Sequence, residues 1–190
     1  KAIVDKLLAE IRGCTVCHDL PLGPRPVLKA STSSKVAIIG QAPGTKVHAS
    51  GIPWDDPSGR LLRKWMNVTD NQFYDPSIFA IVPMGFCYPG KGKTGDLPPR
   101  KECAPQWHQK VFGHCSDIEL FILIGKYAQD YYLPTRKKNL TETVRSFNEY
   151  LPKFLPLPHP SPRNRYWLQR NPWFDELVVP ELAKRIQALI

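Results

Sequence analysis

Three short runs of apolar residues alternate with segments of helical periodicity, and this alternation constrains the fold more than any other feature. The runs occupy residues 35–39, 79–82 and 120–124, and a fourth, interrupted by a proline, follows at 154–157. Strands that are apolar at nearly every position are typical of a parallel sheet buried on both faces. Helical segments are expected at residues 2–12, 59–66, 100–112 and after residue 125. The pattern predicts an α/β fold, a three-layer α/β/α sandwich with a four-stranded parallel sheet, in one domain spanning residues 1–190.

The first apolar run ends in a loop of small residues, Gly40-Gln41-Ala42-Pro43-Gly44. Trp54 follows on the same connection, beside the two carboxylates Asp55 and Asp56. In α/β proteins, ligands bind outside the carboxyl ends of parallel strands. We therefore expect this connection to form part of a ligand site. A tight turn between a strand and a helix is the alternative explanation for the small residues of the loop.

The charge of the chain indicates the kind of partner. The formal net charge is +9, and the pI is near 9.4. Nucleic acid is the commonest partner of such a basic surface, although a basic surface without a specific partner is the alternative. No apolar run is long enough to span a membrane, so we expect a cytoplasmic protein with no membrane partner. The five cysteines, without a secretion signal, predict metal ligation rather than disulfides.

Two loops together resemble the signature motifs of a known family. The loop Gly40 to Gly44 and the segment His159-Pro160-Ser161-Pro162 resemble the first and second motifs of the uracil-DNA glycosylase superfamily. The segment Gly51-Ile52-Pro53-Trp54 is most similar to the family 4 type, whereas residues 159–164 (HPSPRN) look more like the single-strand-selective type. The resemblance implies a monomeric, monofunctional DNA repair glycosylase. It would hydrolyse the N-glycosidic bond of a flipped deaminated base, foremost uracil, in association with a bacterial nucleoid.

Four cysteines match the iron–sulfur ligands of the family 4 type. The resemblance implies that a [4Fe-4S] cluster is held by Cys14, Cys17, Cys87 and Cys103. A tetrahedron of four thiolates also suits a structural zinc ion, and four unrelated buried thiols are the third alternative. Cys115 has no counterpart in the family.

The resemblance also implies roles for residues around the first loop. His159 would donate a hydrogen bond to the uracil O2 as negative charge builds there, and its alternative role is to cap the following turn. Trp54 would stack on the flipped base, and its alternative is a place in the core. The backbone N–H groups of Gly40 and Ala42 would contact the base and the sugar.

The first departure from the family pattern lies in the first loop. Gln41 stands where family 4 has a glutamate, and Ala42 stands where family 1 has its water-activating aspartate. Gln41 can hold a water but cannot deprotonate it, so we expect Asp56, before Asp55, to supply the carboxylate. The alternative for Asp56 is a charge at the start of a helix.

The second departure concerns base recognition. Pro83 occupies the position of the asparagine that reads the uracil edge in family 4. We therefore expect backbone groups of Met84, Gly85 and Phe86 to bind the base.

Residues of the second motif and the positions just after it are the expected DNA contacts. They are Ser161, Arg163, Asn164 and Arg165, with Tyr166 or Trp167 as a wedge that fills the gap left by the flipped base. Two rival functions stay open: a non-catalytic or covalent binder of damaged DNA, and a glycosylase for hypoxanthine or xanthine. A flavodoxin-like nucleotide-binding protein is disfavoured, because the first loop lacks the lysine of a P-loop and the GxGxxG spacing.

Overall fold

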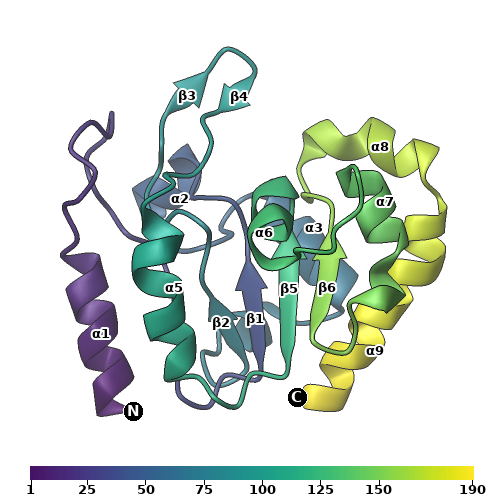
Figure 1. Cartoon of the computed structure of the whole chain (residues 1–190), viewed down its shortest axis with the longest axis horizontal. Coiled ribbons are helices and arrows are strands. Elements are labelled where there is room, and N and C mark those ends of the chain that lie inside the picture. The colour runs from purple at the N-terminus through teal and green to yellow at the C-terminus, as the bar shows by residue number, and fades with distance from the viewer.

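The computed structural model describes all residues 1–190, and its centre is a four-stranded sheet (Figure 1). The spatial order of the strands is β2-β1-β5-β6, and every neighbouring pair is parallel. The strands are β1 (Val36–Ile39), β2 (Phe79–Ile81), β5 (Leu120–Ile124) and β6 (Phe154–Leu157). With helices on both faces of this sheet, the predicted three-layer α/β/α fold is confirmed.

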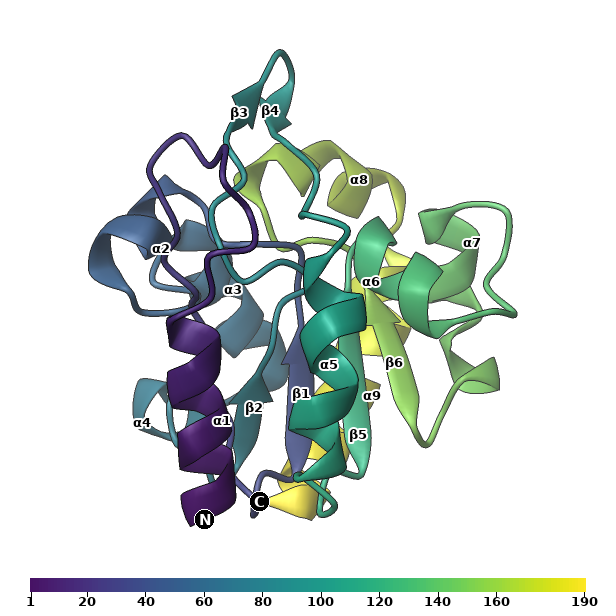
Figure 2. The ribbon, with the colours of Figure 1, turned by 60° about the vertical axis from the view of Figure 1, so that its left-hand side comes forward.

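The two helical layers follow from the alternation of side chains along the strands. Val36 and Ile38 of β1 point into the larger core cluster, and Ile39 points into a second cluster on the opposite face. Figure 2 shows one layer in front of the sheet and the other behind it. The front layer consists of α1 (Ala2–Arg12), α5 (Cys103–Gly113) and α6 (Lys126–Tyr132), and the rear layer of α3 (Pro57–Met66), α4 (Asp70–Phe73) and α9 (Val179–Leu189). The remaining α-helices are α2 (Thr45–Ser50), α7 (Leu140–Arg145) and α8 (Arg165–Arg170), and three short helices of other types are η1 (Phe147–Glu149), η2 (Pro162–Asn164) and η3 (Phe174–Val178).

Both edges of the sheet are protected against further strand pairing. On the outer side of β2, Lys29 and Ile81 exchange backbone hydrogen bonds of 2.9 and 2.7 Å in an isolated antiparallel bridge. At the other edge, β6 contains Pro156, which has no N–H to offer to another strand. The sheet therefore ends at four strands.

A small hairpin follows β2. It consists of β3 (Lys91–Gly92) and β4 (Gly95–Asp96), which pair antiparallel. Figure 1 shows this hairpin projecting above the carboxyl ends of the parallel strands. Strands of two residues, rich in glycine and lysine, have no apolar alternation by which they could be recognised.

The parallel arrangement gathers four connections at one edge of the sheet. The loops after β1, β2, β5 and β6 begin near Gly40, Val82, Gly125 and Pro158, and all leave from the carboxyl ends of the strands. The two sequence motifs are thus brought to the same edge, although more than a hundred residues separate them in the chain. In none of the helices does length combine with apolarity in the way that a membrane span requires.

Removing a central side chain should destabilise this fold strongly. Ile122 on β5 is fully buried, so Ile122→Ala should lower the free energy of unfolding by roughly 2–5 kcal/mol through the lost transfer energy and the cavity left behind. Urea denaturation measures the loss. The matched control is Leu177→Ala, at a side chain that is 59% exposed, which should change stability by less than about 0.5 kcal/mol. Equal effects of the two changes would contradict the assignment of the core.

Candidate active site at the carboxyl edge of the sheet

A cleft opens where the loop after β1 meets the loop after β6. It has an empty volume of about 440 Å³, including its open mouth. Residues from five connections form its walls, foremost Gly40, Gln41, Ala42, Pro43, Gly44, Pro53, Trp54, Asp56, Pro83 and His159. The structure thus brings together six of the predicted site residues, Gly40, Gln41, Ala42, Trp54, Asp56 and His159. Asp55 is exposed and is not part of the lining.

Trp54 lies in a slot that only glycine neighbours permit. A Cβ on Gly40 would lie 2.8 Å from the indole ring, and one on Gly59 would lie 1.8 Å from the Trp54 carbonyl oxygen. The backbone of Trp54 itself has φ +58°, a left-handed conformation that costs a bulky residue on the order of 1–3 kcal/mol. Such strain persists only where surrounding contacts determine it, and it is common at functional sites.

His159 faces Trp54 across the cleft, with ring centroids 5.6 Å apart and planes inclined by 33°. Burial lowers the pKa of His159, while the negative charge of Asp56 acts in the opposite direction. The imidazole is therefore neutral at neutral pH and carries a single N–H. The loop is fixed from behind, because the Asn164 side-chain amide donates to the His159 carbonyl at 2.8 Å.

Asp56 has two functions at the cleft wall. Its Oδ1 accepts a hydrogen bond of 2.8 Å from the Gly59 N–H, so it is the N-cap of α3. Its Oδ2 makes no hydrogen bond within the protein, and the residue lines the cleft together with Gln41. The capping role expected as the alternative is present, and it leaves one carboxylate oxygen available to a ligand or a water.

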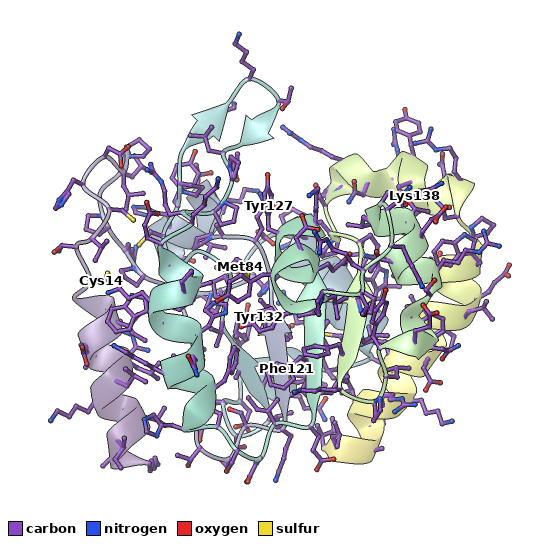
Figure 3. The ribbon with its side chains drawn as sticks, viewed as in Figure 1. Cys14, Met84, Phe121, Tyr127, Tyr132 and Lys138 are labelled. Carbon is purple, nitrogen blue, oxygen red and sulfur yellow. The ribbon has the colours of Figure 1, made fainter.

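The three residues expected to read the base lie elsewhere. Met84, Gly85 and Phe86 are buried and do not line the cleft, and Met84 lies between α5 and α6 (Figure 3). Their N–H groups are already engaged: Met84 to Gly40 O at 2.9 Å, Gly85 to Gln41 O at 3.0 Å, and Phe86 to Cys103 Sγ at 3.4 Å. These bonds hold the loop after β2 against the loop after β1, so the N–H groups are not free to bind a base. The cleft wall at this place is Pro83.

A histidine missed by the sequence analysis supports the Pro83 wall. His108 on α5 is buried, and its Nε2 lies 2.7 Å from the Pro83 carbonyl oxygen. Because a carbonyl can only accept, Nε2 carries the proton, and the Tyr132 hydroxyl donates to Nδ1. Burial lowers the pKa of His108 to about 4. No local pattern distinguishes this residue, since both its partners come from distant segments.

A wider groove leads from the cleft to the surface. It has an empty volume of about 1350 Å³, including open solvent, and is lined by the second motif on one side and by the hairpin on the other. Ser161, Arg163 and Asn164 lie in it, as do the hairpin residues Lys91, Thr94 and Asp96. The two sides are connected, because Arg163 Nη1 donates to the Thr94 carbonyl at 2.9 Å. Glycine at position 95 leaves room for this guanidinium.

The remaining predicted DNA contacts lie beside the groove. Arg165 is exposed but does not line it, and its guanidinium lies 5.1 Å from the ring centre of Tyr166. Trp167 packs against the main core, and its Nε1 donates to Thr141 at 2.8 Å. Tyr166 is 60% exposed. Of the two aromatics expected as a wedge, Tyr166 is therefore the exposed one.

The four predicted cysteine ligands line one further cavity. It has an empty volume of about 440 Å³, including the open solvent at its mouth, and lies between the end of α1, where Figure 3 labels Cys14, and the start of α5. Cys14, Cys17, Cys87 and Cys103 all face it, among apolar side chains such as Val16, Leu20, Phe86 and Trp107. Burial raises the pKa of the Cys17 and Cys87 thiols, and raises that of Cys103 to about 12.

The donor set limits what these thiols could hold. Four thiolates suit an iron–sulfur cluster, and a tetrahedron of four thiolates also suits zinc. The structure brings the four predicted ligands to one cavity. It does not place three cysteine, histidine or acidic side chains at the spacing of a single metal ion.

Comparison with known families agrees with this geometry. Residues 29–183 match the family described as the uracil DNA glycosylase superfamily. The match covers most of the chain, including both loops that form the cleft, and the chain belongs to this superfamily. The superfamily consists in general of hydrolytic glycosylases that act on deaminated bases in DNA.

The low pKa of His108 predicts a loss of stability in acid. Because the folded-state pKa of about 4 lies below the ordinary value of 6.5, the stabilising contribution is complete above pH 6.5 and is lost as the pH falls toward 4. The total is about 3 kcal/mol, of which about 2 kcal/mol is lost by pH 5. Urea denaturation at pH 7.5, 6 and 5 should show this extra loss in the wild type relative to His108→Gln. Parallel pH profiles of the two proteins would contradict it.

Proposed function

We propose that this protein is a monomeric, monofunctional DNA glycosylase that hydrolyses the bond between deoxyribose and a flipped deaminated base, with uracil as its main substrate. The observation that carries the proposal is the pair formed by Trp54 and His159, an aromatic face and a neutral imidazole 5.6 Å apart in one cleft. Within the superfamily, this protein would resemble the family 4 type most, with a second motif like that of the single-strand-selective type.

The base would enter the cleft after leaving the DNA stack, which costs a few kcal/mol. Trp54 offers a face on which the base can stack, and such stacking is worth roughly 1–3 kcal/mol per base. Gly40 and Gly44 have no Cβ and Ala42 has only a methyl group, so the base and sugar can approach the backbone closely. Binding in the cleft thus offsets part of the cost of extrusion.

His159 would stabilise the leaving group. As the C1′–N1 bond breaks, its electron pair moves onto the base, and negative charge grows on the uracil O2. A neutral imidazole can donate its single N–H to this oxygen without a prior change of protonation. A donor placed at a developing oxyanion typically contributes 10²–10³-fold to kcat.

Asp56 and Gln41 would act on the sugar side. The free Oδ2 of Asp56 can orient a water and stabilise the positive charge of the oxocarbenium-like sugar. The water oxygen forms the new bond to C1′, and Asp56 takes up its proton for release to solvent. Gln41 can hold this water by hydrogen bonding, but it cannot accept the proton.

The outer groove would hold the DNA strand. Arg163, Ser161 and Asn164 line it and provide one guanidinium and two neutral hydrogen-bonding groups for phosphates. Arg165 lies beside them on the exposed start of α8. Tyr166 would fill the gap in the duplex that the flipped base leaves.

The cysteine cavity would hold a [4Fe-4S] cluster through Cys14, Cys17, Cys87 and Cys103. When bound, the cluster would supply structural cross-links rather than reaction chemistry. Its four ligands come from the end of α1, the segment before the hairpin and the start of α5. The Phe86 N–H, 3.4 Å from Cys103 Sγ, would stabilise the thiolate.

A second candidate function is favoured by Pro83. The cleft wall at this position has no side-chain amide, so nothing there distinguishes the hydrogen-bonding edge of uracil from that of hypoxanthine or xanthine. A glycosylase for those bases is therefore the rival activity. A binder of damaged DNA without turnover is the rival in which Asp56 serves only as a helix cap.

The roles of His159 and Asp56 can be tested on oligonucleotides that carry one uracil, hypoxanthine or xanthine. His159→Ala should lower the single-turnover excision rate by about 10²–10³-fold, and Asp56→Asn by about 10²-fold. Asp55→Asn is the matched control, because this carboxylate is outside the cleft, and its rate should stay within about twofold of the wild type. Tight binding without abasic product on any of the three substrates would instead establish the damage binder.

The cluster can be tested independently of catalysis. Anaerobically purified protein should be brown, absorb in the visible region and contain about four iron atoms per chain. Cys17→Ser should lose the colour and most of the iron. Cys115→Ser is the matched control, because Cys115 is buried outside the cavity, and it should retain both. A colourless protein with one zinc ion per chain would overturn the cluster.

A further inference from the structure

A buried arginine lies directly beneath the strained Trp54 backbone. Arg63 on α3 is only 8% exposed. Its Nη1 donates to the Trp54 carbonyl at 3.1 Å and to the Tyr74 hydroxyl at 3.2 Å. Its Nε pairs with Asp70 Oδ1 at 2.9 Å, which balances the buried charge. One planar guanidinium therefore connects the Trp54 backbone to two other segments.

Tyr74 extends the same contact to the preceding residue. Its hydroxyl donates to the Pro53 carbonyl at 2.9 Å, and its ring lies 5.5 Å from the Arg63 guanidinium. Burial is the main cause of a raised pKa for Tyr74, so the hydroxyl stays protonated and remains a donor. Two consecutive carbonyls, those of Pro53 and Trp54, are thus held by one arginine and tyrosine pair.

This arrangement exceeds what attachment of α3 to the sheet requires. Leu62, Trp65 and Met66 of the same helix are already buried in the main core. A buried guanidinium is costly to desolvate, and an apolar side chain would fill the space at a lower cost. What the arginine and tyrosine add is a fixed geometry at Pro53 and Trp54, where the chain adopts its left-handed conformation.

We propose that Arg63 and Tyr74 are positioning residues that hold Trp54 in its left-handed conformation and so fix the stacking face for the extruded base. The proposal rests on the function proposed above, because it assigns Trp54 as the face that receives the base. Neither residue touches the substrate. Both act through the Pro53–Trp54 backbone, and their loss should loosen the indole ring without emptying the core.

Two substitutions remove the contacts while conserving size or charge. Arg63→Lys keeps the positive charge, but a single ammonium cannot reproduce the three-way fork. Tyr74→Phe keeps the aromatic ring and removes only the hydroxyl that donates to Pro53. Each should lower kcat/KM for uracil excision by about tenfold, within the range of roughly 5- to 100-fold expected for loss of the Trp54 stack.

A double-mutant cycle distinguishes positioning from general stability. Trp54→Ala should lower kcat/KM by about 5- to 100-fold. If Arg63 acts through Trp54, adding Arg63→Lys to Trp54→Ala should cause no further loss beyond about twofold. An equal loss in both backgrounds would overturn the proposal. Lys64→Arg, on an exposed position of the same helix, is the matched control and should leave kcat/KM unchanged.

A measurement without turnover tests the same proposal. The chain has five tryptophans, so protein labelled with 5-fluorotryptophan should give five ¹⁹F resonances, and the Trp54 resonance is the one missing from Trp54→Phe. In Arg63→Lys and in Tyr74→Phe this resonance should shift and broaden, while that of Trp107, in the cysteine cavity, stays unchanged. An unchanged Trp54 resonance in both variants would overturn the positioning role.

The two readouts separate the possible failures. If the wild type excises no base, the proposed function fails, and the ¹⁹F spectra still decide whether Arg63 and Tyr74 hold Trp54. If excision occurs but the Trp54 resonance is unaffected, the proposed function survives and the positioning role fails.

Discussion

The site depends on one steric constraint, the slot in which the Trp54 backbone turns left-handed. Gly40 supports the indole ring from the loop after β1, and Gly59 approaches the Trp54 carbonyl from the first turn of α3. Asp56 caps that same turn and leaves one oxygen for the cleft. The helix, the first loop and the aromatic face are therefore parts of one packing arrangement. A substitution at either glycine would disturb all three at once, which links the stability of this region to the chemistry of the cleft.

Much of the fold could be predicted because strands buried on both faces leave continuous apolar runs, as in β1 and β5. Because the strands are parallel, their carboxyl ends lie at one edge of the sheet, and the two motifs meet there. The β3–β4 hairpin could not be predicted, because it has no core-facing residues to give a periodic signal.

His108 and Arg63 were missed for another reason: each lies in an ordinary helix, and its role arises only from contacts with distant carbonyls. The sequence also did not reveal that the N–H groups of Met84 to Phe86 bind within the protein, which leaves them unavailable to a base.

The cysteine cavity and the outer groove share one stretch of chain. The hairpin lies between Cys87 and Cys103, and it returns to the second motif through the contact between Arg163 and Thr94. The hairpin has only one short ladder of its own, so its position depends on how its two ends are held. A bound cluster would fasten both ends, while the cleft around Trp54 is supported separately by α3. A disturbance of the cysteine site would thus also move the hairpin that forms one wall of the groove, because the two lie on the same stretch of chain.

The Pro83 wall has a consequence for selectivity. Its carbonyl is bound by His108 on the side away from the cleft, and the ring presents only carbon to a ligand. A surface of this kind excludes ligands that are too large, but it does not distinguish ligands by their hydrogen-bond donors and acceptors. Steric discrimination against a slightly different ligand is worth only about 10- to 200-fold, whereas a dedicated polar contact reaches far higher ratios. This wall by itself would therefore admit ligands that differ only in their donors and acceptors. In a cell, such breadth would be useful where one activity must act on several products of the same spontaneous decay.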